Sequence, residues 1–276
     1  MRVPVLTYHA AIISGTDYLG NDHVALASDL ELIQRFGLRI VPLQQVVNAR
    51  IGRCEPLPAG CVALSCDDGT DYDYRDLEHP AAGPVRSFHN LMTDFQFRHG
   101  HEAQPGLHMT AFVTADPEAR QRMDQRCLQA RGDFNDDWWR PALLSGRWAI
   151  ENHSWDHNHP ELDSPGPHGI QRGDFANIDR FEKAEYEIAQ ARDYIDQRLA
   201  PSRTRLFCYP FGHVSSYLHD EYLPTRGVEL GLDAAFCDGG EPVTMDSDRW
   251  RLPRYICGWH WKSPTELERL LGTRAM

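Results

Sequence analysis

Short apolar runs alternate along the chain with segments that have one apolar and one polar face. Six of the apolar runs are expected to form strands: "VPVLTY" (3–8), "CVALS" (61–65), "MTAFVT" (109–114), "RWAIE" (147–151), "RLFCY" (205–209) and "AAFC" (234–237). Several of them are almost continuously apolar, which is typical of strands covered on both faces. Strands that alternate with helices predict a parallel sheet with crossover connections, so we expect an α/β fold.

The helices between these runs are expected from caps and from spacing. Ser28 is placed as the N-cap of a helix over 29–36. Pro42 stands where a first helical turn tolerates proline. The clearest helix is expected over 174–199, where apolar residues recur at steps of three and four or their multiples.

Residues 70–108 interrupt the alternation because they are rich in Gly, Pro, His and Asp. We expect a long irregular insertion here, around one short helix near 87–97, and insertions of this length often act as lids or binding loops. There is no internal repeat and no shift in composition that would mark a second domain. We therefore expect residues 1–276 to form a single domain, a length that α/β barrels commonly have.

Composition and charge narrow the classes of partner. The net charge is −12, and no run of Lys or Arg offers the basic face that nucleic-acid binding needs. The seven cysteines are odd in number and form no C-x-x-C pair, which fits a reducing compartment better than a disulfide framework. The strand-like run at the N-terminus leaves no room for a signal peptide, and no stretch approaches the ~18 apolar residues of a membrane span. We expect a cytoplasmic protein without a membrane partner.

Polar motifs follow the expected strands at their carboxyl ends. They are His9, Asp67 with Asp68, His153 with His157, and Pro210-Phe211-Gly212. In parallel α/β folds, and in barrels especially, these ends converge on one face, and that face carries the chemistry. The positions therefore predict one site assembled from distant segments.

The residue types at this site favour a metal. His153 and His157 are four apart, so on a helical turn both would point the same way. Two imidazoles and one carboxylate, for which Asp68 is the natural choice, form the ligand set of a catalytic metal site with open positions. His159 precedes Pro160 and is expected behind the ligands or at the surface. The blander alternatives are an ordinary Asp-Gly turn and exposed histidines.

The motifs "LSCDDG", "NHSWDH" and "YPFG" resemble the first three motifs of the polysaccharide deacetylases, also called NodB-homology or carbohydrate esterase family 4 proteins. The opening "VPVLTYH" resembles the branch in which the strand with the catalytic histidine stands at the start of the chain. The resemblance runs from about residue 3 to about residue 256. It implies a distorted (β/α)7 TIM-like barrel.

The resemblance also implies roles for individual residues. Asp68, His153 and His157 would hold a divalent metal, most often zinc. Asp67 would be the general base, the backbone N–H of Phe211 would face the oxyanion, and His9 would be the general acid. No other cofactor is implied.

Two departures from the family pattern leave choices open. Cys208 stands where the third motif of the family has an arginine that orients the base, and Arg254 in "RLPRY" is our hypothesis for its substitute. His260 in "GWHWK" is the rival of His9 as general acid, and we favour His9 because it follows a strand.

The function implied is metal-dependent hydrolysis of the amide bond of an N-acetylated sugar or polysaccharide. One alternative keeps the fold and changes the substrate to a small-molecule or cyclic amide, which suits a cytoplasmic protein. The other is a non-catalytic carbohydrate-binding protein, for which the missing arginine is the only support. The sequence leaves the substrate, the metal and the oligomeric state open.

Overall fold

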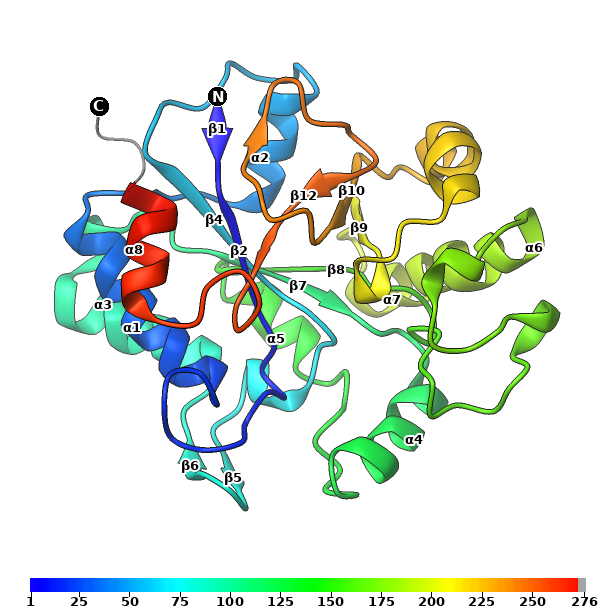
Figure 1. Cartoon of the computed structure of the whole chain (residues 1–276), viewed down its shortest axis with the longest axis horizontal. Coiled ribbons are helices and arrows are strands. Elements are labelled where there is room, and N and C mark those ends of the chain that lie inside the picture. Colours follow the sequence, from blue (N-terminus) through cyan, green and yellow to red (C-terminus); the bar gives the residue numbers. More distant parts are fainter. Residues whose placement is uncertain (273–276) are drawn as a thin grey trace.

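Parallel strands close into a barrel at the centre of the structure, a computed structural model that describes residues 1–272 (Figure 1). Around the barrel the strands are β2 (Val5–Tyr8), β4 (Cys61–Cys66), β7 (Met109–Val113), β8 (Trp148–Asn152), β9 (Leu206–Cys208), β10 (Ala234–Cys237), β12 (Leu252–Pro253) and β13 (Tyr255–Ile256). Since β12 and β13 are consecutive, they act as one interrupted strand. The described residues therefore form the expected seven-strand α/β barrel.

The interrupted strand closes the barrel. Its first half pairs with β10, with Cys237 opposite Pro253, and its second half pairs with β2, with Leu6 opposite Tyr255. Arg254 lies at the break between the two halves. This seventh strand is absent from the six runs expected from the sequence.

Side chains alternate between the inside and the outside of the barrel. Val5, Ala63 and Phe112 belong to one apolar cluster. Above them, the hydroxyls of Thr7 and Ser65 lie 2.8 Å apart, both fully buried. Along β4 the next position with the same parity is 67, so the strand itself directs Asp67 towards the barrel axis.

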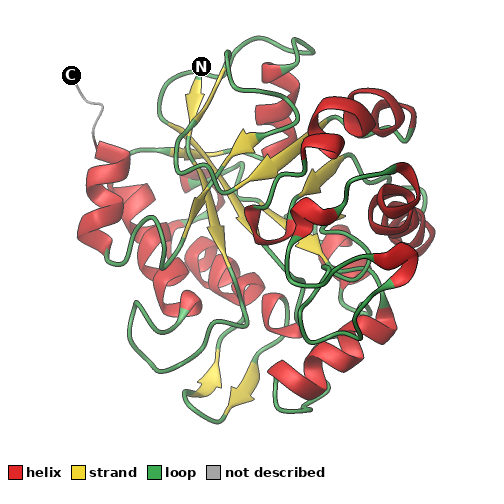
Figure 2. Cartoon of the chain, turned by 45° about the vertical axis from the view of Figure 1, so that its right-hand side comes forward, coloured by secondary structure: helices red, strands yellow, loops and turns green. Residues whose placement is uncertain are grey.

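Helices flank the strands on the left and right sides of the view in Figure 2. They are α1 (Asp22–Arg35), α2 (Leu43–Arg50), α3 (Phe88–His99), α4 (Pro117–Cys127), α5 (Trp139–Leu144), α6 (Phe181–Ala184), α7 (Gln190–Leu199) and α8 (Pro264–Gly272). Helix α1 packs against both α3 and α8 at one side of the barrel, on the left in Figure 1. None of the helices within residues 1–272 has the length and apolar character needed to cross a bilayer.

Two helix boundaries differ from those expected. Helix α1 begins at Asp22, and the side chain of Asn21 accepts the hydrogen bond of the N-cap, so Ser28 lies inside the helix. The helix expected over 174–199 begins at Phe181 and contains a π-helical turn at Glu185–Ala189 between α6 and α7.

The segment 70–108 is more regular than expected. A short antiparallel hairpin, β5 (Leu77–His79) with β6 (Gly83–Val85), extends from the lower edge of the molecule in Figure 1. It is followed by α3, the helix expected near 87–97. The remaining strands are short: β1 (Arg2–Val3) pairs with β11 (Val243–Thr244), and β3 (Arg39–Ile40) pairs with β4.

Candidate active site

All seven site residues expected from the sequence line one cavity of about 640 Å³. They are His9, Asp67, Asp68, His153, His157, Phe211 and Arg254. These residues come from the carboxyl ends of five different strands, counting Arg254 at the break of the last one. The cavity therefore occupies the face of the barrel where parallel strands place their chemistry.

A backbone reversal brings both adjacent carboxylates into this cavity. In an extended strand neighbouring side chains point to opposite faces, so Asp68 would leave the site that Asp67 enters. The φ angle of Asp68 is +72° and that of Gly69 is +86°, which turns Asp68 back. Any side chain at Gly69 would be crowded, because a Cβ there would lie 2.6 Å from Cγ1 of Val113. The reversal thus starts at Asp68 itself and depends on the glycine that follows.

Asp68, His153 and His157 form a compact group of potential ligand atoms. Asp68 Oδ1 lies 3.4 Å from His157 Nε2 and 3.8 Å from His153 Nε2. Ligands bound tetrahedrally at ~2.0–2.1 Å from zinc are separated by about 3.4 Å. The spacing and the donor set both fit a divalent metal.

The two imidazoles are held in the form that a metal needs. Nδ1 of His153 lies 3.0 Å from the carbonyl oxygen of Cys208, so this nitrogen carries the proton and the lone pair of Nε2 faces Asp68. Burial lowers the pKa of His153 and lowers that of His157 well below its ordinary value. Both rings are therefore neutral near pH 7.

The segment that carries the histidines is a strained loop rather than the helical turn expected. Ser154, His157 and Asn158 have φ angles of +72°, +62° and +46°. Such conformations cost about 1–3 kcal/mol each and persist only where their surroundings hold them. Here the His157 N–H donates to Ser154 Oγ at 2.9 Å, and buried Asp156 accepts from Arg172 Nη1 at 2.7 and 2.8 Å.

Arg254 forms a bidentate ion pair with Asp67 through both terminal nitrogens. Nη1 donates to Oδ1 at 2.7 Å and Nη2 to Oδ2 at 2.8 Å, and the two side chains are only 2% and 4% exposed. Burial alone would raise the pKa of the Asp67 carboxyl, but the Arg254 guanidinium, followed by His153, holds that pKa well below its ordinary range. The guanidinium also lies over the ring of Phe112, 5.4 Å from its centre. Asp67 is therefore an oriented carboxylate.

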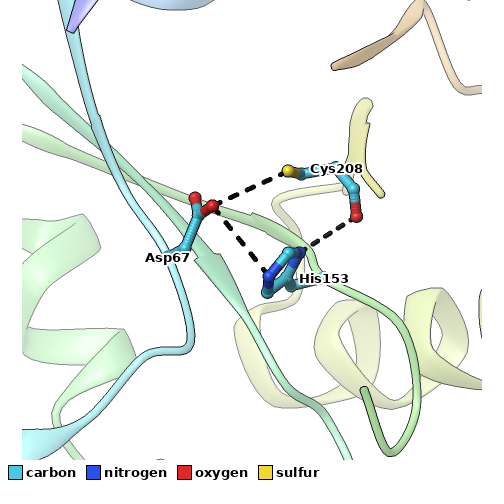
Figure 3. A group of neighbouring side chains, drawn as sticks. All are labelled: Asp67, His153 and Cys208. Atoms are coloured by element: carbon cyan, nitrogen blue, oxygen red, sulfur yellow. Dashed lines mark hydrogen bonds and ion pairs between the residues drawn. The ribbon is translucent and has the colours of Figure 1, made fainter. Parts of the chain in front are cut away.

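A second group of potential ligands consists of Asp67, His153 and Cys208 (Figure 3). The Cys208 thiol lies 3.9 Å from Asp67 Oδ2, and burial raises the pKa of this thiol well above its ordinary value. The positive charge of Arg254 beside Asp67 disfavours a cation here. The first group, with Asp68, is the better ligand set.

Comparison with known proteins relates part of the chain to a described family. The polysaccharide deacetylase family model matches residues 103–227, a stretch that includes His153, His157 and Phe211. This stretch of the chain is therefore similar to the polysaccharide deacetylases. No curated protein matches it.

Solved structures share the fold of this chain at low identity. Similar structures include the Streptococcus pyogenes deacetylase PplD in complex with acetate (TM-score 0.62, 13% identity, 98% of each chain covered) and IcaB from Ammonifex degensii (TM-score 0.62, 18% identity, 98% of this chain and 96% of that chain). BA0330 from Bacillus anthracis is also similar, with a TM-score of 0.57 and 12% identity over 93% of this chain and 65% of that chain. The chain thus spans almost all of the first two proteins and about two thirds of the third.

The two candidates for the general acid lie in different surroundings. His9 lines the cavity, and its Nε2 lies 3.9 Å from Asp67 Oδ2. His260 does not line it: Nδ1 accepts the N–H of Ile256 at 2.8 Å, and the ring packs against Gly240. The geometry favours His9.

Phe211 lies in a short turn, Pro210–Gly212, after β9, with a φ angle of +59°. Gly212 and His213 donate their N–H groups to Tyr209 and Pro210, but within residues 1–272 the N–H of Phe211 has no acceptor. The Phe211 ring packs edge-on against His157, 4.5 Å between ring centres. The turn thus supports a ligand histidine and leaves one backbone donor available.

The cavity also contains residues other than the seven expected site residues. Asp238 follows β10 and Trp259 follows β13, and both line the cavity with Met123 and His159. Like the expected site residues, Asp238 directly follows a strand-like run, "AAFC". In the sequence it reads as part of an Asp-Gly-Gly turn.

Proposed function

We propose that the chain is a metal-dependent hydrolase that removes N-acetyl groups from an N-acetylated sugar or polysaccharide. The observation that carries the proposal is the joint presence, in one cavity, of the Asp68–His153–His157 group and the Asp67–Arg254 pair. The first group would hold the metal. The second gives a carboxylate that is kept ionised and oriented beside it.

When bound, a divalent metal such as zinc lowers the pKa of water and polarises a carbonyl oxygen. Asp67 accepts the proton of the attacking water. Arg254 prepares it for this role by keeping the carboxylate ionised and oriented. The backbone N–H of Phe211 donates to the oxygen of the acetyl group as negative charge develops there, commonly a large contribution to catalysis. His9 gives a proton to the departing nitrogen, a role that is commonly worth ~10²–10⁴ in rate.

The alternative of a non-catalytic binding protein is weakened by the Arg254 contact. It depended on the arginine missing at position 208, and a guanidinium reaches Asp67 from another strand. The small-amide alternative differs only in substrate and is decided by assay.

The test combines metal analysis with acetate release. Purified protein is expected to bind roughly one equivalent of zinc and to release acetate from N-acetylglucosamine oligomers. Changing both His153 and His157 to Ala is expected to abolish metal binding, whereas His219→Ala, a control at a partly exposed histidine paired with Asp220 and Asp248, retains it. Asp67→Asn keeps the metal and loses acetate release.

Failure of the wild-type protein to take up zinc refutes the proposal. Zinc uptake with activity only on small amides, seen as acetate release from aryl acetamides or as ring opening of cyclic amides, favours the small-amide alternative.

A further inference from the structure

A π-helical turn, Glu185–Ala189, lies between α6 and α7, and α7 packs against β8. Such turns are rare and are frequently found at functional sites. In an α-helix consecutive side chains are about 100° apart, so three neighbours in a row do not share one face. Here Glu187, Ile188 and Ala189 are all buried. The π-helical turn therefore places three consecutive residues inside the protein.

This turn contacts the loop that carries the two candidate histidine ligands. The Tyr186 hydroxyl donates to Asp156 Oδ2 at 3.0 Å, and Glu187 Oε2 accepts the N–H of Asp156 in a long hydrogen bond of 3.4 Å. The carbonyl oxygen of Ile188 accepts from Asn152 Nδ2 at 2.9 Å. Asn152 directly precedes one candidate ligand, and Asp156 directly precedes the other. The turn thus holds the loop just before each histidine.

The two contacted residues extend this support along the loop. Asn152 Oδ1 accepts the N–H of Ser154 at 2.8 Å, and Asp156 Oδ1 accepts the N–H of Asn158 at 2.9 Å. Ser154 and Asn158 have positive φ angles, a conformation that persists only where the surroundings hold it. All four of these residues are buried, as is Glu187. The turn and the strained loop therefore form one buried hydrogen-bonded unit.

Glu187 differs from the other glutamate of the turn. It is fully buried and has no ion pair with Lys or Arg within residues 1–272, and such glutamates are rare. Burial, followed by the charge of Asp156, raises the pKa of Glu187 well above its ordinary value, so the carboxyl group is protonated near pH 7. Glu185 is partly exposed, and its carboxylate accepts from Arg226 and from the Tyr222 hydroxyl. Only Glu187 faces the histidine loop.

We propose that this π-helical turn is a positioning element for the candidate metal centre and that Glu187 is its main positioning residue. Glu187 does not line the cavity. It fixes the backbone at Asp156, so that Nε2 of His157 and Nε2 of His153 stay within 3.4 and 3.8 Å of Asp68 Oδ1. The inference rests on the proposed function, because it needs the metal at these three residues.

The test is the zinc affinity of the purified protein, measured by competition with a chromophoric chelator. Glu187→Leu keeps a similar volume and removes the acceptor. It is expected to weaken zinc binding about tenfold, the lower end of the ~10–100-fold range for groups that orient metal ligands, because Glu187 acts through the backbone. Glu187→Gln retains a neutral acceptor oxygen and is expected to bind zinc almost as the wild-type protein does.

The visible absorption spectrum of the cobalt-loaded protein reports the geometry of the ligands. Glu187→Leu is expected to change this spectrum, because the histidines are then less well fixed, and Glu187→Gln is expected to leave it unchanged. A merely structural role would lower stability in urea without changing the spectrum of the folded protein.

Glu185→Leu is the matched control on the same turn. It loses the contacts with Arg226 and Tyr222 and is expected to lower stability in urea, with the zinc affinity and the cobalt spectrum unchanged. Tyr186→Phe removes only the hydroxyl that donates to Asp156 and is expected to weaken zinc binding severalfold. This variant decides the matter if Glu187→Leu does not fold.

An unchanged zinc affinity and cobalt spectrum in Glu187→Leu, or equal changes in Glu185→Leu, overturn the positioning role. Acetate release by the zinc-loaded wild-type protein is a separate readout. If zinc affinity depends on Glu187 but no acetate is released from any substrate, the proposed function fails and the positioning role stands. If acetate is released and Glu187→Leu binds zinc as the wild-type protein does, only the positioning role fails.

Discussion

The contact between Arg254 and Asp67 gives the sharpest prediction. Arg254→Met removes the two charged hydrogen bonds of 2.7 and 2.8 Å and leaves the Asp67 carboxylate 4% exposed. The nearest remaining partners of that carboxylate are the Cys208 thiol and the His9 ring, each 3.9 Å away, and the His153 ring at 4.0 Å. The variant therefore contains a buried charge whose only remaining side-chain hydrogen bond within the described chain is the long, weak one from the Cys208 thiol.

Breaking a buried ion pair on one side costs about 3–5 kcal/mol. At about 2–3 °C per kcal/mol for a chain of this size, the midpoint of thermal unfolding falls by roughly 6–15 °C. Arg254→Lys keeps the charge but loses the planar fork, so an intermediate loss is expected. Acetate release is expected to fall in both variants because Asp67 is no longer held.

The free energy of unfolding in urea and the thermal midpoint are measured with chelator present, so that metal binding does not contribute to the stability of the folded protein. Arg147→Met is the control, since Arg147 donates to the neutral oxygens of Gln96 and Thr93 and its loss costs about 1 kcal/mol. Adding Asp67→Asn to Arg254→Met removes the orphaned charge and is expected to recover at least half of the lost stability. A loss no greater than the control's, or no recovery in the double variant, refutes the reasoning.

Three further predictions concern folding, pH and thiols. Gly69→Ala places a Cβ 2.6 Å from a valine methyl carbon, whereas a Cβ at Gly100, which has a similar φ of +82°, meets nothing within 4 Å. Gly69→Ala is therefore expected to lower the free energy of unfolding, measured in urea, by about 1–3 kcal/mol more than Gly100→Ala does. Burial raises the pKa of Asp29 to about 7, so the native state keeps a proton that the unfolded chain loses near pH 4. The contribution of Asp29 to stability is therefore complete below pH 4 and is lost as the pH rises to 7. Between pH 5 and pH 8 the free energy of unfolding of the wild-type protein is expected to fall, and Asp29→Asn is expected to remove roughly 2–4 kcal/mol of this fall. Urea unfolding of both proteins at the two pH values tests this. A thiol reagent is expected to modify only Cys54 and Cys127 in the native protein, because the other five cysteines are buried, and a third fast-reacting thiol would contradict the structure.

The parts of the site that the sequence reveals are those attached to visible strands. The run "CVALSC" marks β4, and Asp67 and Asp68 follow at its carboxyl end, where a parallel sheet places a site. Asp238 follows a strand just as clearly, but one aspartate before two glycines has the composition of an ordinary turn. Only its contact with Gly212 and its place in the cavity distinguish it.

The errors arise where distant partners decide the local structure. The expected start of α1 is later than the observed one. Asp22, His23 and Asp29 are buried although they are polar, so they interrupt the apolar pattern from which a packed helix is predicted. His23 is accommodated by the carbonyl oxygens of Ala10 and Arg86, which no local pattern reveals. The strand at 252–256 was missed because it pairs for only two residues on each side, with a charged residue between.

The interrupted strand also fixes when the centre can be completed during synthesis. Asp67, Asp68 and both histidines leave the ribosome well before residue 254, and β2 waits for β13 with one edge unpaired. Until then, the Asp67 carboxylate has no counter-charge. The open edge of the sheet is also exposed, and such an edge can pair with a wrong strand. The same pairing step that seals the barrel therefore delivers the counter-charge of Asp67.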